Sequence, residues 1–488
     1  MSVIIMITQL ILGLTLLVFV HELGHFVAAR IFKMRVSKFY LFFKPICPIV
    51  CCKRIEGKWK FKFFSRNLPD TEKVVDANGK PVLDENGKYK YRIIDINSLP
   101  DGDWRKYPDH TEYGIGWLPL GGYCSISGMI DETQSIENLP SEPQPWEFRS
   151  KPAWQRLIVV LGGIIVNLIV GVLLFSLVLG KYEKEYLPNA AITDGIYAYE
   201  AARKMGFQSG DKIISVDNKI PERFKDAVSA EIYFGSIICV EREGKLVDIV
   251  MGEDAYGLLK ERVQFIEPSN YPPLIDSVLK DGRADDAGIQ KGDKILSIND
   301  TIQTTSYGLF SENIRRFPDQ QVVLTLLRAT DTMQIALAPN ASGQIGVFLK
   351  MPYELKPYSL GQTFTYGWRD AMSSLTLNIK GLGKIIKGTE NARESLSGPI
   401  GIAQMYGSVW NWHRFWFLTG LLSIILAFMN VLPVPGLDGG HALFAIIELV
   451  TGKKVPDKAL QYAQTVGMFL LILLMIFIIG NDIFKLFG

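Results

Sequence analysis

Two histidines and a glutamate lie inside an apolar segment that is long enough to cross a lipid bilayer. The run HELGH, from His21 to His25, follows residues 3–20, which include no charged side chain. About 20 apolar helical residues span the hydrocarbon core, where ionisable side chains are costly unless they face protein, water or a metal. Residues four apart share one helix face, so both imidazoles can reach one zinc ion, with Glu22 beside it. A buried histidine pair satisfied by neighbouring helices is the alternative.

Four apolar stretches of spanning length divide the chain. They cover roughly residues 3–30, 155–180, 414–447 and 464–486, and each is long enough for a transmembrane helix. A hydrophobic content of 48% and a mean hydropathy of +0.16 suit several membrane helices combined with a soluble part. We therefore predict an α-helical polytopic membrane protein with four transmembrane helices. The first stretch lacks the basic start and cleavage site of a signal peptide, so we expect it to be retained.

Basic residues near the ends of these stretches indicate their orientation. Ten lysines and arginines lie between Arg30 and Lys62, and three lysines lie between the last two stretches. Both loops are therefore predicted to be cytoplasmic, with residues 181–413 and both termini outside. The net charge of +2 and the lack of a nucleic-acid-binding motif argue against a nucleic-acid partner. The five cysteines form no pair of CxxC motifs, so we expect free thiols rather than a structural zinc site.

The central segment contains an internal repeat. Residues 202–218 and 284–300 each read as a short helix, a glycine turn and a strand that ends in an Asp/Asn turn. This pattern resembles PDZ domains of bacterial membrane proteases, which implies two PDZ-like α/β domains at 185–258 and 264–350. PDZ domains bind peptides as an added strand. Two small β-rich domains without a peptide ligand are the alternative.

A helix with one apolar face follows the repeats. Its apolar residues recur every three or four positions from Phe364 to Leu382, and three lysines lie near the same helix. The pattern predicts an amphipathic helix at the membrane surface. Packing on the second repeat is the alternative.

A candidate third metal ligand lies in the third apolar stretch. Residues 430–441 interrupt it with two prolines and three glycines, and Asp438 is the only acid between Phe415 and Ile446. Broken backbone at membrane depth is tolerated where it is buried in protein or lines a wet cavity. A catalytic zinc needs a third protein ligand and an open position, and either Asp438 or His441 could supply that ligand.

The order of these motifs resembles the site-2 protease family of intramembrane zinc metalloproteases, of the M50 type. The matching pieces are HELGH, Pro119-Leu120-Gly121-Gly122-Tyr123, the second span with Asn167, the repeats, the Gly398-Pro399-Ile400-Gly401 run and residues 430–440. The resemblance implies that His21, His25 and Asp438 bind Zn²⁺. It also implies that Asn430 binds the substrate backbone and that Asn167 lies near the active site as a further substrate-binding residue. Ile164 departs from the family, which usually has a proline there.

The resemblance also implies a membrane-associated β-hairpin at residues 117–127. There Gly121 and Gly122 would contact substrate, because a substrate helix must open before cleavage and an exposed β-edge can pair with the opened strand. Between Tyr40 and Tyr113 lies a polar insertion. Its turns at 76–79 and 84–87 predict β-hairpins.

The activity implied by the resemblance is intramembrane zinc endopeptidase, with Glu22 as general base. Its substrates would be single-span membrane proteins, such as membrane-bound anti-sigma factors or remnant signal peptides, after an earlier cleavage of the outer domain. The implied location is the bacterial inner membrane, with the PDZ-like domains on the periplasmic side. A non-enzymatic PDZ-bearing scaffold and a metal-dependent transporter or sensor are the alternatives.

These inferences divide the chain into eight segments. They are the first transmembrane helix with HELGH (1–32), a cytoplasmic loop with the insertion and β-hairpin (33–154), the second transmembrane helix (155–182), two PDZ-like domains (185–258 and 264–350), amphipathic juxtamembrane helices (356–412), the third transmembrane segment with LDGG (414–450) and the fourth transmembrane helix (462–487).

Overall fold

The computed structural model divides the chain into two compact units. Residues 1–182 and 360–488 form the first unit, and residues 183–359 form the second. The structure describes residues 2–44, 46–65, 71–73, 91–94, 99, 100, 102–118, 121–129, 143–252, 255, 257, 264–268, 271–350 and 352–487. The predicted turns at 76–79 and 84–87 lie outside these residues, as do Pro119 and Leu120.

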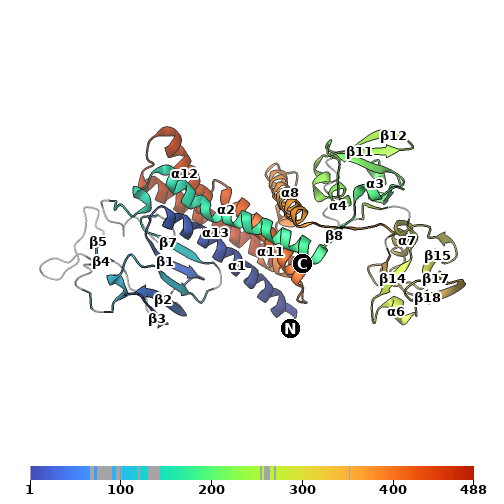
Figure 1. The fold of residues 1–488 in the computed structure, drawn as a ribbon, viewed down its shortest axis with the longest axis horizontal. Coiled ribbons are helices and arrows are strands. Elements are labelled where there is room, and N and C mark those ends of the chain that lie inside the picture. Colours follow the sequence, from blue (N-terminus) through green and yellow to red (C-terminus); the bar gives the residue numbers. More distant parts are fainter. Residues whose placement is uncertain are drawn as a thin grey trace. The chain divides into compact units, whose positions relative to one another are not determined.

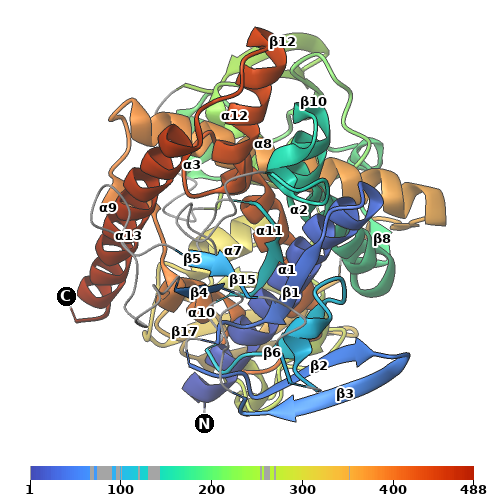
Figure 2. The same cartoon turned by 90° about the vertical axis from the view of Figure 1, so that its left-hand side faces the viewer.

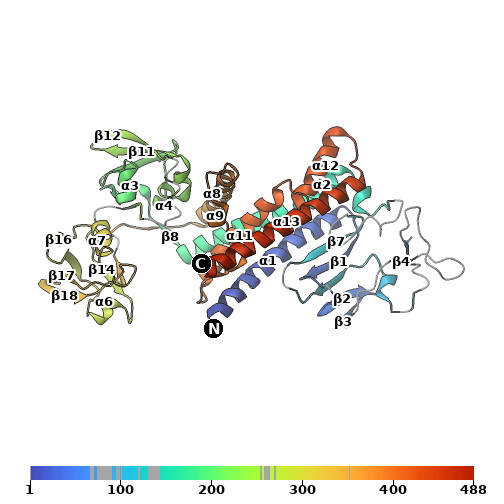
Figure 3. The ribbon, with the colours of Figure 1, turned by 180° about the vertical axis from the view of Figure 1, so that it is seen from behind.

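Four helices of the first unit are long and apolar enough to cross a membrane. The spans are Val3–Ile31, Ala153–Glu183, Trp412–Val431 and Lys458–Lys485. They belong to α1 (Ser2–Ile31), α2 (Ala153–Val178), α11 (Trp412–Val431) and α13 (Asp457–Phe487). Figure 1 shows these helices running in the same general direction, and Figure 3 shows them from behind. The chain therefore has the architecture of a multi-pass membrane protein.

The third apolar stretch forms two helices rather than one. After α11 the backbone turns at Leu432–Leu437, and α12 (Asp438–Thr451) begins at Asp438. Pro433 and Pro435 lack the N–H that would continue α11. Gly436 has a φ of +95°, a left-handed conformation that glycine adopts without strain. The break is tight, because a β carbon on Gly439 would lie 2.0 Å from the Leu432 carbonyl oxygen.

Glycines bring α1 and α2 into close contact. A β carbon on Gly24 would lie 2.3 Å from the carbonyl oxygen of Gly162. The two backbones therefore pack at a distance that no larger residue permits, in the manner of small-residue contacts between membrane helices. This contact lies inside the HELGH sequence, so it places the backbone of α2 next to both histidines.

Helix α8 (Leu360–Ile386) is the predicted amphipathic helix. Its buried residues are Tyr366, Gly367 and Ala371, and Ala371 packs in one cluster with Val172 of α2 and Ile424 of α11. Its apolar residues Phe364, Trp368 and Ile379 stay exposed. These exposed residues fit a helix at the membrane surface.

A five-stranded sheet follows α1 in the chain. Its order is β3-β2-β6-β1-β7, and Figure 2 shows β2 and β3 at its outer side. The strands are β1 (Val36–Leu41), β2 (Val50–Ile55), β3 (Lys58–Phe63), β6 (Glu112–Ile115) and β7 (Tyr123–Ile126). β1 pairs parallel with β6 and antiparallel with β7.

This topology corrects the predicted β-hairpin at residues 117–127. The strands on either side of Gly121-Gly122 are β6 and β7, and they do not pair with each other, because β1 lies between them. The segment is thus the crossover of a larger sheet. Within the insertion, β4 (Thr71–Lys73) pairs antiparallel with β5 (Tyr91–Ile93).

The second unit contains two copies of one arrangement. The first copy has β9 (Ile196–Ala198), α3 (Glu200–Lys204), β10 (Lys212–Val216), α4 (Phe224–Ala227), η7 (Ala230–Phe234), β11 (Ile237–Arg242), β12 (Lys245–Val250) and β13 (Ile266–Pro268). The second has β14 (Ile275–Val278), α6 (Arg283–Asp286), β15 (Lys294–Ile298), β16 (Ile302–Gln303), α7 (Tyr307–Ile314), β17 (Val322–Arg328), β18 (Asp331–Leu337) and β19 (Val347–Leu349). In both copies the first and last strands pair antiparallel.

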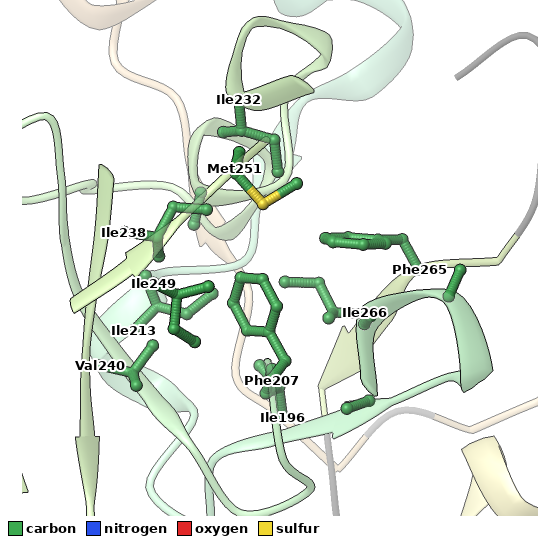
Figure 4. Packing of buried hydrophobic residues seen from close by; sticks show 14 of the residues in the cluster. Ile196, Phe207, Ile213, Ile232, Ile238, Val240, Ile249, Met251, Phe265 and Ile266 are labelled. Carbon is green, nitrogen blue, oxygen red and sulfur yellow. The ribbon is translucent and has the colours of Figure 1, made fainter. Parts of the chain in front are cut away.

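Each copy has its own apolar core and the same buried ion pair. Figure 4 shows the core of the first copy, where Phe207 lies among Ile196, Ile249 and Ile266. Each copy contains a Gly-Asp motif, Gly210-Asp211 in the first and Gly292-Asp293 in the second. The carboxylate of Asp211 lies 2.7 Å from the guanidinium of Arg242, and that of Asp293 lies 2.7 Å from the guanidinium of Arg328. The sequence repeat therefore corresponds to a structural repeat.

The strands that enter and leave the second unit pair with each other. β8 (Glu185–Tyr186) is antiparallel to β20 (Lys356–Pro357). The rings of Tyr186 and Tyr358 lie 4.9 Å apart, and the N–H of Tyr358 donates to the carbonyl of Lys184.

Candidate metal centre

Two imidazoles and one carboxylate converge on a single point in the first unit. The Nε2 atoms of His21 and His25 are 3.2 Å apart. Oδ2 of Asp438 lies 3.2 Å from Nε2 of His21 and 3.3 Å from Nε2 of His25. Among the described residues, these three form the one group of histidine, cysteine or acidic side chains that could hold a metal ion. HELGH on α1 and LDGG at the start of α12 thus supply one site.

The spacing of the three atoms fits a zinc ion. Zinc binds histidine nitrogen and carboxylate oxygen at about 2.0–2.2 Å in a tetrahedral arrangement, which implies ligand-to-ligand distances of roughly 3.3–3.5 Å. The two 3.2 Å separations lie just below this range, and the 3.3 Å separation lies at its lower end. Oδ2 of Asp438 is buried and has no hydrogen-bond donor in the described structure, although it faces both imidazoles. A cation would satisfy this oxygen, and three protein ligands leave a fourth position open.

Helix α2 contacts the far side of both imidazole rings. Nδ1 of His25 lies 2.9 Å from the carbonyl oxygen of Val159, and Nδ1 of His21 lies 3.2 Å from the side-chain amide of Asn167. A histidine that offers Nε2 to a metal carries its proton on Nδ1, and an acceptor at Nδ1 fixes that tautomer. Val159 provides such an acceptor directly, which explains why α2 must pack so closely against α1.

Asn167 is completely buried, and its Oδ1 has no hydrogen-bond partner in the part of the chain that the structure describes. The two ends of an amide have the same shape, and their assignment follows from the hydrogen-bond network. A half-turn of the amide pairs Oδ1 with the Nδ1–H that a zinc-binding His21 carries. The sequence predicted a substrate contact for Asn167, whereas the structure places it behind His21, where it can orient a ligand.

Glu22 lies beside the metal position and next to strand β7. The backbone N–H of Cys124 donates to its carboxylate, and a β carbon on Gly122 would lie 3.7 Å from Glu22 Cγ. Gly122 therefore borders the site, and Gly121 packs against the ring of Phe43. The side-chain amide of Asn430 lies 3.4 Å from Nε2 of His21.

His441, the alternative third ligand, lines a neighbouring pocket that is mostly apolar. Its ring contacts the side-chain amide of Gln464 on α13, and it is not one of the three converging residues. It lines a cavity of about 30 Å³ with Arg156 and Glu448, whose side chains form an ion pair at 2.5 Å. The structure therefore favours Asp438 as the ligand. This pocket was not predicted from the sequence.

Sequence reasoning also missed Gly163, which forms the wall of the site on α2. A β carbon there would lie 2.5 Å from Nε2 of His25 and 2.6 Å from Cε1 of His21. The available signal was the glycine pair 162–163 inside an apolar span, because glycine in a membrane helix commonly lets another backbone or side chain approach closely.

Comparison with known proteins covers most of the chain. The model of peptidase family M50 matches residues 9–65 and 104–474. The chain is 28% identical to a zinc metalloprotease of Treponema pallidum over 79% of this chain and 90% of that protein. It is 26% identical to protease RseP of Yersinia pestis over the full length of both. A zinc metalloprotease of Neisseria meningitidis is 25% identical over 98% of each chain. The interval between the two matched parts lies within the insertion.

Proposed function

Because this chain belongs to peptidase family M50, we propose that this metalloprotease cuts peptide bonds inside the membrane-spanning segments of single-span proteins. The family match confirms the resemblance predicted from the sequence. The observation that carries the proposal is the location of the ligand triad. His21 and His25 lie within the candidate span of α1, and Asp438 follows the break after the span of α11. A metal site at this depth serves a substrate that is itself in the membrane.

His21, His25 and Asp438 would hold the zinc ion. When bound, zinc supplies a Lewis acid that lowers the pKa of a water molecule and polarises a carbonyl group. Val159 and Asn167 would hold the two imidazoles in the tautomer that presents Nε2. Asp438 would offer its Oδ2, which the tight turn before α12 fixes in place.

Glu22 would move the proton in both halves of the reaction. It directly follows His21 in the chain, and Cys124 holds its carboxylate by a backbone hydrogen bond. It would accept a proton from the attacking water and deliver it to the leaving amine, the general acid–base role that glutamate plays in HExxH enzymes. The Asn430 amide would donate a hydrogen bond to the substrate backbone on the open side of His21.

Strand β7 would bind the opened substrate. It is the last strand in the sheet order, so one of its edges is not paired to a described strand, and its backbone already contacts Glu22. A substrate helix must lose its internal hydrogen bonds before a carbonyl becomes accessible. Pairing with β7 would satisfy those freed groups, by the same strand addition that other peptide-binding proteins use. A β carbon on Gly122 would lie 2.6 Å from the carbonyl oxygen of Tyr40, so glycine lets the chain enter β7 close against β1.

The substrates we propose are membrane-bound anti-sigma factors or remnant signal peptides whose outer domain another protease has already removed. The two repeats of the second unit would act as PDZ domains, which test the size or the new carboxyl terminus of the substrate. The basic loops after the first span and before the last support a bacterial inner-membrane protein with these repeats in the periplasm.

The test is cleavage of a single-span model substrate that lacks its outer domain. Purified wild-type protein and Glu22→Gln would be compared, with Glu243→Gln, an exposed acid of the second unit, as the matched control. Product from wild type and Glu243→Gln alone would support the proposal and the role of Glu22. Equal product from Glu22→Gln would refute it. Zinc-loaded wild type that cuts no membrane substrate would instead favour a scaffold.

A further inference from the structure

The outermost strand of the five-stranded sheet alternates lysine with aromatic residues. β3 reads Lys58-Trp59-Lys60-Phe61-Lys62-Phe63. Successive side chains of a strand point to opposite faces, so Trp59, Phe61 and Phe63 share one face and the three lysines share the other.

The strand register extends the aromatic face across the sheet. Phe61 is opposite Cys52 of β2, Cys52 is opposite Tyr113 of β6, and Tyr113 is opposite Phe39 of β1. Directly opposed residues lie on the same face. One row of residues therefore runs from the outer edge of the sheet to the strands nearest α1.

This row continues onto the membrane-spanning helix. The ring of Phe39 lies 5.9 Å from Phe19 and 5.4 Å from Phe26, both on α1. Tyr113 lies 6.0 Å from Phe26 and 6.0 Å from Trp59. Phe26 and Phe19 precede Arg30, the first basic residue, by four and eleven helical positions, or about 6 and 16 Å along the axis. The face that packs on α1 therefore lies beside the apolar part of the helix.

The side of this face nearest α1 is buried, whereas the side formed by the outer strands is exposed. Phe39 is 8% exposed, whereas Ile115, Trp59, Phe61 and Phe63 are 40%, 53%, 61% and 68% exposed. No described segment covers these four residues. The opposite face has its own core of Tyr40, Cys51, Ile55 and Trp104, and Lys62 lies over the ring of Trp104. The sheet thus has one packed face and one half-open face, which is largely apolar and carries the exposed Arg54 opposite Trp59.

We propose that the open half of this face rests in the lipid leaflet next to the sheet, with β3 at the headgroup level. Three features of β3 fit a position at the boundary between lipid acyl chains and headgroups. Tryptophan and other aromatic residues concentrate where acyl chains meet headgroups. Lysines attract anionic headgroups. The edge of β3 that pairs with no described strand needs hydrogen-bond partners, which headgroups and water supply and the hydrocarbon core does not. The surface anchors the sheet, and hence β7, at a fixed depth relative to α1.

The experiment uses the alternation within β3. The photoreactive residue p-benzoylphenylalanine replaces Trp59, Phe61 or Phe63 in the full-length protein, and Lys58 or Lys60 in matched controls on the same strand. Each variant is placed in nanodiscs of phosphatidylethanolamine and phosphatidylglycerol, illuminated and analysed by mass spectrometry. We expect lipid adducts at 59, 61 and 63 that exceed those at 58 and 60 several-fold.

Three results would overturn the proposal: no lipid adduct at the aromatic positions, equal adducts at all five positions, or adducts to a second protein copy or a substrate in place of lipid. A second measurement does not depend on the photoreactive residue. Lipids with brominated acyl chains should quench more emission from the wild-type protein than from Trp59→Phe. Equal quenching of both would place Trp59 outside the lipid. Neither measurement requires proteolysis, so the proposal stands or fails separately from the proposed function.

Discussion

Oδ2 of Asp438 lies 3.2 Å from Nε2 of His21, although the two residues belong to the first helix of the chain and to a helix near its end. The break between α11 and α12 makes this contact possible, because it places an acidic side chain at the beginning of a helix and directs it to α1. The chain between them includes a sheet, α2 and the whole second unit. The chemistry of the site therefore depends on how the helices pack in the first unit.

Replacing Asp438 should remove zinc and activity together. Asp438→Asn keeps the size of the side chain but removes the charge, and we expect bound zinc to fall at least about tenfold, since even residues behind the ligands change metal affinity by 10–100-fold. Metal content by mass spectrometry and cleavage of the model substrate measure both effects. His441→Gln is the control and should retain zinc. If Asp438→Asn kept its full zinc content and His441→Gln lost zinc, His441 rather than Asp438 would be the third ligand.

Gly163→Ala should abolish zinc binding without unfolding the protein. Alanine favours a helix over glycine by about 1 kcal/mol, yet its methyl group would lie 2.5 Å from Nε2 of His25. Gly480→Ala, at an open position of α13, makes the same change away from the site. Zinc content and thermal unfolding would be compared. Normal zinc in Gly163→Ala would show that the ligands do not sit against α2.

Asn167 should act through its oxygen. Asn167→Asp retains an acceptor for the Nδ1–H of His21 and should keep zinc affinity within a few-fold, whereas Asn167→Leu should weaken it by about 10–100-fold. Chelator competition measures the affinity, and the visible spectrum of the Co²⁺-loaded protein reports the ligand geometry. Ser176→Ala on the same helix is the control. If Asn167→Asp were as defective as Asn167→Leu, the amide would act as a donor.

The second repeat of the second unit should lose stability in acid through Asp293. Hydrogen bonds from Arg328 hold the pKa of Asp293 below its usual value. A depressed pKa in the folded state stabilises the fold above the unfolded value of about 3.9, and this stabilisation is lost as the pH falls through the folded pKa. Asp293→Asn should cost about 1–3 kcal/mol near neutral pH and flatten the acid dependence.

Denaturant unfolding of the full-length protein, followed across pH 3–7, measures this effect. Asp319→Asn is the control, because Asp319 is exposed and its left-handed backbone also suits asparagine. If the stability of Asp293→Asn depended on pH as that of the wild type does, the ion pair would not contribute to the loss of stability in acid.

The ligand triad could be predicted from the sequence because each part carries a local signal. Four-residue spacing places His21 and His25 on one helix face, and Asp438 is the only acid in an apolar stretch. The choice between Asp438 and His441 remained open, since both lie in the broken segment and only packing against α1 separates them. The rest of the site depends on contacts between helices. Gly163, the Val159 carbonyl and the buried Asn167 act through the approach of α2 to α1, which no periodic pattern encodes.

The sheet was the weaker part of the prediction. The family resemblance implied a hairpin around Gly121-Gly122, where the local sequence has strand character on both sides of the glycines. β1 pairs with both of those strands instead, and such long-range pairing has no local signal. The aromatic alternation of β3 was visible in the sequence, but its meaning depends on which face packs against α1.

The pairing of β8 with β20 has a consequence for how the chain can vary. Paired strands lie about 4.8 Å apart, so the chain departs for residues 187–355 and returns at nearly the same place. A two-residue turn could join Tyr186 to Lys356 across this gap. Residues 187–355 could be deleted, duplicated or exchanged. In each case the same two short strands would still connect α2 to α8. The second unit is therefore a module that can be exchanged as a whole. Its size can change without altering how the helices that hold the metal site pack together.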